Sequence, residues 1–321
     1  MKSVFSLFVS FGILALLIYF SNPHKVMEIF LSSNPLFLAV AFCSWFFSAV
    51  LRTVRWKILL RNVGINPDFA TALKVLLAGL AVSNLTPGKV GEPVRAYFLK
   101  KSTGEYFSTV VSSIFVERVC DFLAILTLGA FSLFLLFTTP YFTYFVLAVC
   151  LYAFLFLFGI YILASGRRTA KSVNFLFKIL GFIPKIRKRK SEIAGFSENI
   201  HRSFLTYKNW KVIFCTYLIT LLIWILESLV FYFAFVSINA QISPFLIVTL
   251  SPLLTIISIL TFLPGGLGSG DALAVFVYSF VAGLSYSQVT AASLLGRIAA
   301  FFPCIAIGMY FASKYKISLK N

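Results

Sequence analysis

Charged residues are scarce in this chain. Of its 321 residues, only 12% are charged, whereas 60% are hydrophobic and 17% are aromatic. These are too few polar side chains to cover a folded chain with a water-compatible surface. Apolar runs of about twenty residues recur instead, and they indicate a polytopic α-helical membrane protein. The runs are continuous rather than alternating, which disfavours a membrane β-barrel.

Histidines and paired cysteines are also lacking. The two histidines, His24 and His201, are isolated, so the sequence offers no histidine-based metal centre. No CxxC pair occurs, and single cysteines lie in apolar stretches at positions 43, 120, 150, 215 and 304. We interpret them as small hydrophobic residues rather than a disulfide framework, and we expect neither a metal nor another cofactor.

Acidic residues are outnumbered, with 10 Asp and Glu against 28 Lys and Arg. The basic residues cluster at Arg52–Arg61 and in a loop at about 165–209. We interpret both clusters as loops beside membrane segments, placed by the positive-inside rule and by anionic lipid headgroups, so nucleic acid is not an expected partner. The second loop also carries apolar residues at helical spacing, which predict an amphipathic helix on the cytoplasmic leaflet. These are Ile193, Phe196, Ile200 and Phe204.

Hydropathy predicts the helices that cross the cell membrane. The long apolar segments are Val4–Phe20, Pro35–Leu51, Ser108–Phe137, Tyr141–Ala164, Trp210–Val236 and Ser287–Ala312. The first is interpreted as a retained helix, because no small-x-small cleavage site of a signal peptide follows it. The Arg52–Arg61 cluster places the N-terminus in the cytoplasm, and the crossing count places the C-terminus there too. In the last segment Ala292, Gly296 and Ala300 form a small-residue face suited to close helix contact.

Two further apolar segments are interrupted by Pro and Gly. Residues 70–101 begin and end near cytoplasmic basic residues, and residues 244–284 begin and end outside by the same crossing count. Each segment is therefore predicted to be a re-entrant hairpin with its tip near mid-membrane. The tip residues are Pro87, Gly88 and Gly91 in the first hairpin and Pro264, Gly265, Gly266 and Gly268 in the second.

The predicted fold is an all-α polytopic membrane protein with a single transmembrane domain over residues 1–321. It has about seven transmembrane helices plus two re-entrant helical hairpins in an inverted-topology arrangement. Irregular backbone at membrane depth survives only inside protein or beside a water-filled cavity, because unpaired backbone groups are costly in hydrocarbon. Paired interruptions of this kind predict a substrate cavity at the midplane, where glycines and helix N-termini can approach an anion.

Ionisable residues lie inside the predicted spans and at the hairpin tips. Each costs about 2.5–3.5 kcal/mol at a helix centre and needs a partner or an aqueous cavity. The candidate substrate-binding residues are Lys89, Glu92, Arg95, Glu117, Arg118, Asp121, Asp271 and Arg297. The arginines and the lysine would hold a phosphate, because guanidinium groups match phosphate oxygens. The carboxylates would position the arginines, bind an ammonium group or carry a proton.

Structural roles are the alternative for several of these charges. Arg118 could pair with Asp121 or Glu117 only to join helices, and Asp271 could simply cap a short helix predicted to begin at Ala272. Glu227 is isolated and nearer the outer side of its span, so it is the weakest candidate of the charged set.

Three motifs together resemble a known family. They are LTPGKVGEPVRAYFLKK, VERVCDFLAIL and FLPGGLGSGDA, in this order and at these separations. The chain resembles the transmembrane region of lysylphosphatidylglycerol synthases over nearly its whole length. The resemblance implies a lipid translocase fold with re-entrant hairpins, which in two-part synthases flips aminoacylated phosphatidylglycerol to the outer leaflet. Lys89 stands where an arginine is common, and Ser269–Asp271 replaces a stretch that usually ends in glutamate, so the headgroup stays open. Some archaeal relatives are linked to glycosylation lipids, which keeps a polyprenyl-phosphate substrate open as well.

The leading hypothesis is a flippase-like transporter of an anionic or aminoacylated phospholipid or of a polyprenyl-phosphate lipid. Its partners would be membrane lipids and a separate lipid-modifying enzyme. The chain stops at Asn321 without a soluble acyltransferase domain, so we do not expect aminoacyl transfer. A membrane transferase using Glu117 and Asp121 in acid–base roles is the second hypothesis. A scaffold with purely structural charges is the third.

Overall fold

The computed structural model describes residues 2–86, 89, 91–104, 107–137, 140, 142–163, 165, 167–168, 171 and 209–315. The predicted amphipathic helix at 193–204 and the tip residues Pro87 and Gly88 lie outside the described residues. The regular elements of the described part are all helical, as predicted. Five stretches within it are long and apolar enough to cross a membrane: Pro35–Asn62, Phe142–Ile162, Trp210–Ser237, Pro264–Ala282 and Tyr286–Lys314. The chain is therefore a multi-pass membrane protein, and its described part is all-helical.

Short connections join the consecutive helices from α1 to α7 and from α11 to α15. The first half of the chain contains α1 (Lys2–Phe20), α2 (Pro23–Leu31), α3 (Pro35–Asn62), α4 (Phe69–Leu85), α5 (Val94–Thr103), α6 (Phe107–Leu136) and α7 (Phe142–Leu163). The second half contains α11 (Trp210–Ser237), α12 (Pro244–Leu260), the short η2 (Pro264–Gly266), α13 (Ser269–Ala282), α14 (Tyr286–Gly296), the π-helical η3 (Arg297–Phe301) and α15 (Phe302–Lys314).

Local sequence explains where several helices begin. α3 starts at Pro35, whose missing N–H is not needed in a first turn, and Asn34 before it accepts a hydrogen bond from the N–H of Leu36. Asp68 caps α4 in the same way by accepting the N–H of Thr71. These caps satisfy backbone donors that the helices themselves leave unpaired.

α3 is longer than the sequence predicted. The predicted end at Leu51 is wrong, because the helix continues through Arg52–Arg61 to Asn62 and spans about 42 Å at 1.5 Å per residue. No Gly or Pro interrupts this stretch before Gly64, and Arg55 within it is only 1% exposed. The basic cluster is therefore the last part of a packed helix and not a loop beside the membrane.

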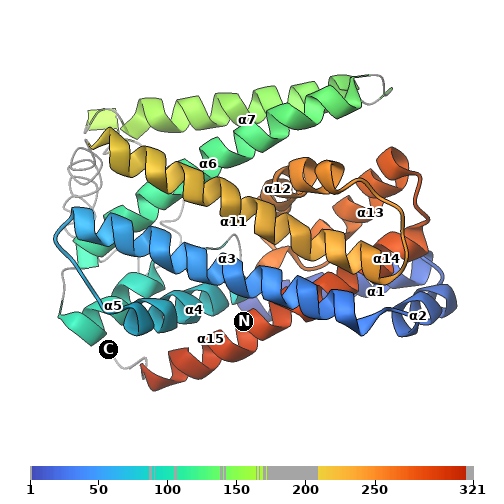
Figure 1. Cartoon of the computed structure of the whole chain (residues 1–321), viewed down its shortest axis with the longest axis horizontal. Helices are drawn as coiled ribbons and strands as arrows, with labels where there is room; N and C mark the ends of the chain where they lie inside the picture. Colours follow the sequence, from blue (N-terminus) through green and yellow to red (C-terminus); the bar gives the residue numbers. More distant parts are fainter. Residues whose placement is uncertain are drawn as a thin grey trace.

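The two interrupted segments turn back on themselves. Figure 1 shows α4 and α5 toward one end of the long axis and α12 and α13 toward the other end, with α3 and α11 running between the two ends. α3 packs along α11, and η2 packs against α4. The connection between α4 and α5 and the connection between α12 and α13 are called the two chain breaks here, because each interrupts a helix, not the polypeptide. The two chain breaks therefore lie near each other in the middle of the molecule.

Small residues allow close helix contacts. A Cβ added to Gly296 would lie 3.4 Å from the Phe231 ring of α11, which confirms the predicted contact at this part of the small-residue face. A tighter approach, not predicted from the sequence, occurs at Gly308 of α15. A Cβ there would overlap the carbonyl oxygen of Leu77 and stand 2.5 Å from the Cβ of Ala81, both in α4. α15 therefore packs backbone to backbone against α4.

Candidate functional site

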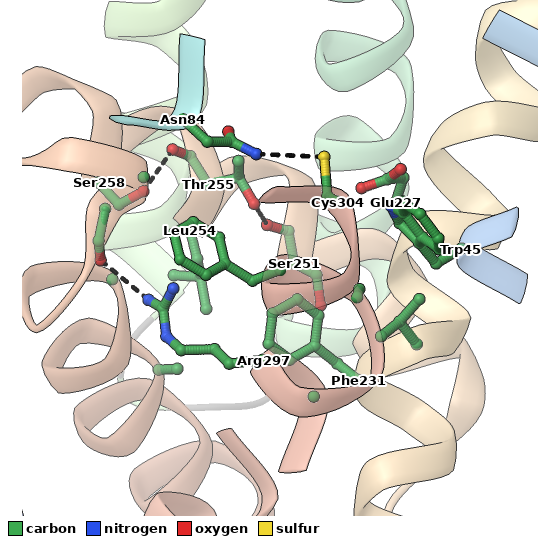
Figure 2. Close-up of a pocket in the computed structure, with 18 of the residues that line it drawn as sticks. Trp45, Asn84, Glu227, Phe231, Ser251, Leu254, Thr255, Ser258, Arg297 and Cys304 are labelled. Atoms are coloured by element: carbon green, nitrogen blue, oxygen red, sulfur yellow. Dashed lines mark hydrogen bonds between the residues drawn. The ribbon is translucent and has the colours of Figure 1, made fainter. Parts of the chain in front are cut away.

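A cavity of about 210 Å³ lies between the two chain breaks. A single buried water needs only about 10–15 Å³, so the cavity has room for a larger polar group. Figure 2 shows Asn84, Ser258 and Arg297 around this hollow, with Glu227 and Trp45 on another part of its wall. The lining residues come from α3, α4, α6, α11–α15 and both chain breaks. The cavity is therefore central to the helix packing.

The second chain break requires glycine. Gly265, Gly266 and Gly268 have φ angles of 58°, 62° and 78°, a region that residues with a Cβ rarely adopt. A Cβ on Gly265 would overlap the ring of Phe301 and lie 3.2 Å from the carbonyl oxygen of Asn84 at the end of α4. The predicted tip residues of the second hairpin thus bring the backbone close to the first chain break and to the cavity wall.

Asp271 and Arg297 form an ion pair beside the second break. Arg297 donates from Nε to Asp271 Oδ1 at 2.8 Å and from Nη2 to Oδ2 at 2.7 Å. Asp271 also accepts the N–H of Gly268 at 2.9 Å and the hydroxyl hydrogen of Ser293. Arg297 Nη2 donates in addition to the carbonyl oxygen of Gly266 at 3.1 Å. Asp271 therefore caps α13 from within its first turn and also fixes Arg297, which ties α14 and η3 to the break.

A second set of charges joins α3, α5 and α6 in a single network. Its members are Arg55, Glu92, Arg95, Glu117, Arg118 and Asp121. Arg55 lies between Glu117, at 3.4 Å, and Asp121, at 2.7 Å. Arg95 pairs with Glu117. The side chains of these four residues are at most 7% exposed, so their charges are removed from bulk solvent and compensate one another.

Arg118 links this network to the cavity. Its Nη2 lies 2.8 Å from Asp121 Oδ2, three residues along the same helix, and its Nη1 lies 3.1 Å from Glu92 Oε1. The Arg118 side chain is 32% exposed, and both Arg118 and Glu92 line the cavity. The network contains three arginines and three carboxylates, so within the described residues it is electrically balanced.

The structure separates the eight predicted binding residues into two groups. Lys89, Glu92, Arg118, Asp271 and Arg297 line the cavity. Arg95, Glu117 and Asp121 do not line it and belong to the buried part of the network behind it. The guanidinium of Arg95 lies 4.9 Å from the centre of the Trp56 ring, a cation–π contact that fills its remaining face.

Lys89 differs from the arginines. It has a φ of 56°, which is unusual for a residue with a side chain, and its side chain lines the cavity. Within the part of the chain that the structure describes, its ammonium group has no hydrogen bond or ion pair, whereas Arg118 and Arg297 are each held by carboxylates. Lys89 is thus the cavity cation with the fewest competing contacts among the described residues.

Sequence reasoning missed two members of the site, Arg52 and Arg55, and underrated a third, Glu227. Arg52 lies 3.3 Å from Glu227 through Nη2 and Oε1, and both residues line the cavity. Arg55 was overlooked because α3 was predicted to end at Leu51. Glu227 was ranked last because the sequence showed no partner for it. The available signal was the spacing of Ser48, Arg52 and Arg55, which places them on one face of a continuing helix.

Comparison with known proteins gives a consistent match. The family model described as lysylphosphatidylglycerol synthase TM region matches residues 3–308. The chain is 28% identical to a UPF0104 membrane protein of Methanothermobacter thermautotrophicus, over 100% of this chain and 99% of that protein. It is 26% identical to a UPF0104 membrane protein of Methanocaldococcus jannaschii, over 94% and 91% of the two chains. A shorter match, 27% identical, covers 35% of this chain and 18% of glycosyltransferase AglD of Haloferax volcanii.

Proposed function

The chain belongs to the lysylphosphatidylglycerol synthase transmembrane-region family, and on this premise we propose that it translocates the headgroup of an anionic lipid through the central cavity. The observation that carries the proposal is the position and charge of that cavity. It lies between the two chain breaks and is lined from both. Among its described lining residues, the cations are Arg52, Lys89, Arg118 and Arg297, and the carboxylates are Glu92, Glu227 and Asp271. Four against three leaves an excess of one positive charge, which favours an anion.

Lys89 supplies the first contact to the phosphate. Among the described residues, no carboxylate contacts its ammonium group. Lys89 can therefore bind a phosphate oxygen without first breaking an ion pair. Arg118 and Arg297 stand at the cavity edge and are oriented by Glu92, Asp121 and Asp271. The acyl chains stay in the surrounding lipid while the headgroup occupies the polar space.

The proposal also covers how the helical segments and the two chain termini are placed in the membrane. The segments α4–α5 and α12–α13 are two re-entrant hairpins that enter from opposite membrane faces, with both chain termini in the cytoplasm. The turning back of each pair and the contact of η2 with α4 support this arrangement. Movement of one hairpin at a time would open the cavity to one leaflet at a time, because the broken helices meet at the binding site.

Reconstitution tests the proposal. The full chain is placed in lipid vesicles that carry an anionic phospholipid, an aminoacylated phospholipid or a polyprenyl phosphate, and a membrane-impermeant reagent reports the exposed headgroups over time. We expect faster exchange than in protein-free vesicles for at least one of these lipids. Exchange no faster than the protein-free rate for all three would reject the transport function.

Matched lysine variants locate the site. Lys89→Gln should slow exchange by about tenfold or more, because a hydrogen bond to a charged group contributes about 1.5–3 kcal/mol. Lys100→Gln changes an exposed lysine at the end of α5 and should leave the rate unaltered. Equal rates for the two variants would remove Lys89 from the binding site.

An integral-membrane transferase is the second candidate. The short similarity to a glycosyltransferase favours it, although the match covers a small part of that protein. Glu117 and Asp121 would be its acid–base pair, but Glu117 is fully buried and both are held by arginines. Formation of a new lipid product from a labelled donor, lost in Asp121→Asn, would support this candidate over transport.

A further inference from the structure

Glu227 has the most accessible carboxylate of the charged set. All three cavity carboxylates line the same space, and the Glu227 side chain is 32% exposed, against 14% for Glu92 and 3% for Asp271. Only its Oε1 atom is engaged within the described residues, by the hydroxyl of Ser48 at 2.5 Å and by Arg52 at 3.3 Å. Asp271, in contrast, is held through both oxygens by Arg297, Gly268 and Ser293. Glu227 is therefore open to exchange with cavity water.

The hydrogen bonds around Ser48 fit a protonated Glu227. Ser48 is fully buried, and its hydroxyl oxygen lies 2.8 Å from the carbonyl oxygen of Trp45 and 2.5 Å from Glu227 Oε1. A serine hydroxyl has one hydrogen to donate and can accept two. When Glu227 is ionised, the single hydroxyl hydrogen of Ser48 faces two acceptor oxygens, so one of the two contacts has no hydrogen between its oxygens. With Glu227 protonated, the acid donates to Ser48 and Ser48 donates to Trp45, so both contacts become hydrogen bonds.

Protonation would change the charge that the cavity presents. Glu227 is the only partner that the described residues show for Arg52, so neutral Glu227 leaves that guanidinium free and raises the positive excess from one to two. The other titratable groups along this cavity are Lys89, Glu92, Arg118, Asp271, Tyr278, Arg297 and Cys304. Glu92 and Asp271 face their own arginines, and Cys304 is hydrogen-bonded by the amide of Asn84 at 3.6 Å. Arg52 is the cation that contacts Glu227, and Lys89 lines the same cavity.

We infer that Glu227 binds a proton together with each lipid anion, and that this proton releases Arg52 to share the phosphate with Lys89. The inference rests on the proposed transport function and adds its energy source. A proton from cavity water attaches to Glu227 Oε1, and the same proton leaves to water on the opposite side after the headgroup has moved. A phosphodiester anion and one proton cross together, so the step carries no net charge.

The coupling is reciprocal. An anion bound at Arg52 and Lys89 brings a negative charge close to the Glu227 carboxylate, and a nearby like charge promotes uptake of a proton by a carboxylate. The proton in turn frees Arg52 and strengthens binding of the anion. Thermodynamic linkage requires the two effects to be equal in free energy.

Infrared spectroscopy tests the proton site independently of transport. The full chain in lipid nanodiscs is titrated with acid, and the carboxylic-acid C=O band is followed in the wild type, in Glu227→Gln and in Glu28→Gln. Glu28 is an exposed carboxylate on α2 and serves as the matched control. We expect one component of this band to grow as the pH falls, to be missing in Glu227→Gln and to be retained in Glu28→Gln. Identical titrations of the two variants would overturn the inference.

A pH gradient tests the coupling. In vesicles with a gradient of one pH unit, the wild type should enrich the anionic lipid in one leaflet by up to about tenfold, the ratio of the proton concentrations. Glu227→Gln cannot take up the proton, so whatever exchange it supports should show no such enrichment. If the wild type exchanges lipid but the pH gradient does not change the leaflet distribution, the coupling is rejected and the proposed transport function is not. Absence of wild-type exchange for every lipid would reject the transport function and its coupling together, and the infrared titration would still decide whether Glu227 binds a proton.

Discussion

Asn84 and Gly265 bring the two chain breaks into contact. A Cβ on Gly265 would stand 3.2 Å from the carbonyl oxygen of Asn84, although the two residues lie in different halves of the chain. The same Cβ would overlap the ring of Phe301. The backbone of η2 therefore forms part of the cavity wall because it carries no side chain at this point.

Gly265→Ala should destabilise the protein and disturb the cavity. The matched control is Gly283→Ala, since Gly283 has a similar φ of 66° but no atom within 4 Å of an added Cβ. Left-handed backbone alone costs a residue with a Cβ about 1–2 kcal/mol. We expect this loss for Gly283→Ala and a larger one for Gly265→Ala, measured by thermal unfolding in detergent. Equal losses would show that the contact with Phe301 and Asn84 is not tight.

Gly308→Ala should separate α15 from α4. The added methyl group would overlap the backbone of Leu77, and overpacking of this kind costs about 1–3 kcal/mol. Gly159→Ala in α7 is the control, because nothing lies within 4 Å of its added Cβ and alanine favours a helix by about 1 kcal/mol. The two unfolding temperatures should move in opposite directions. A neutral Gly308→Ala variant would contradict the packing.

Arg55→Met should be strongly destabilising. It leaves the buried network with two arginines and three carboxylates, and loss of one partner from a buried ion pair costs about 3–5 kcal/mol. Arg61→Met alters an exposed arginine of the same helix, hydrogen-bonded to Asn66, and should change stability by less than about 0.5 kcal/mol. Chemical denaturation of both variants in the same detergent gives the comparison. Similar midpoints would mean that the network does not stabilise the fold.

Thiol labelling should reveal the hairpins. Single cysteines are introduced after the exposed native ones, Cys43, Cys150 and Cys215, are replaced by alanine. Asn66→Cys and Gly104→Cys flank the first hairpin and should react only from the cytoplasmic side. Gln241→Cys and Tyr286→Cys flank the second and should react only from outside. A flanking pair that reacts from opposite sides would show that its segment spans the membrane.

Hydropathy alone located most of the helices. α7 and α11 lie within a few residues of the predicted spans, because about twenty apolar residues have a stable arrangement in lipid only as a helix. The break at Pro264–Gly268 was also evident, since Pro and Gly interrupt a helix through their own backbone properties. The end of α3 was predicted wrongly, because basic residues such as Arg55 were assigned to water before their buried partners were known.

The sequence by itself determined that this chain is helical, lies in a membrane and concentrates its charges beside two backbone breaks, because these properties depend on local composition and on residue type. Only the tertiary structure decided which charges meet. Arg297 faces Asp271, Arg55 joins Glu117 to Asp121, and Arg52 faces Glu227, all through contacts between different helices. The rotation of each helix about its axis and its position along its neighbours select these partners, and both depend on packing contacts such as that of Gly308 with Leu77.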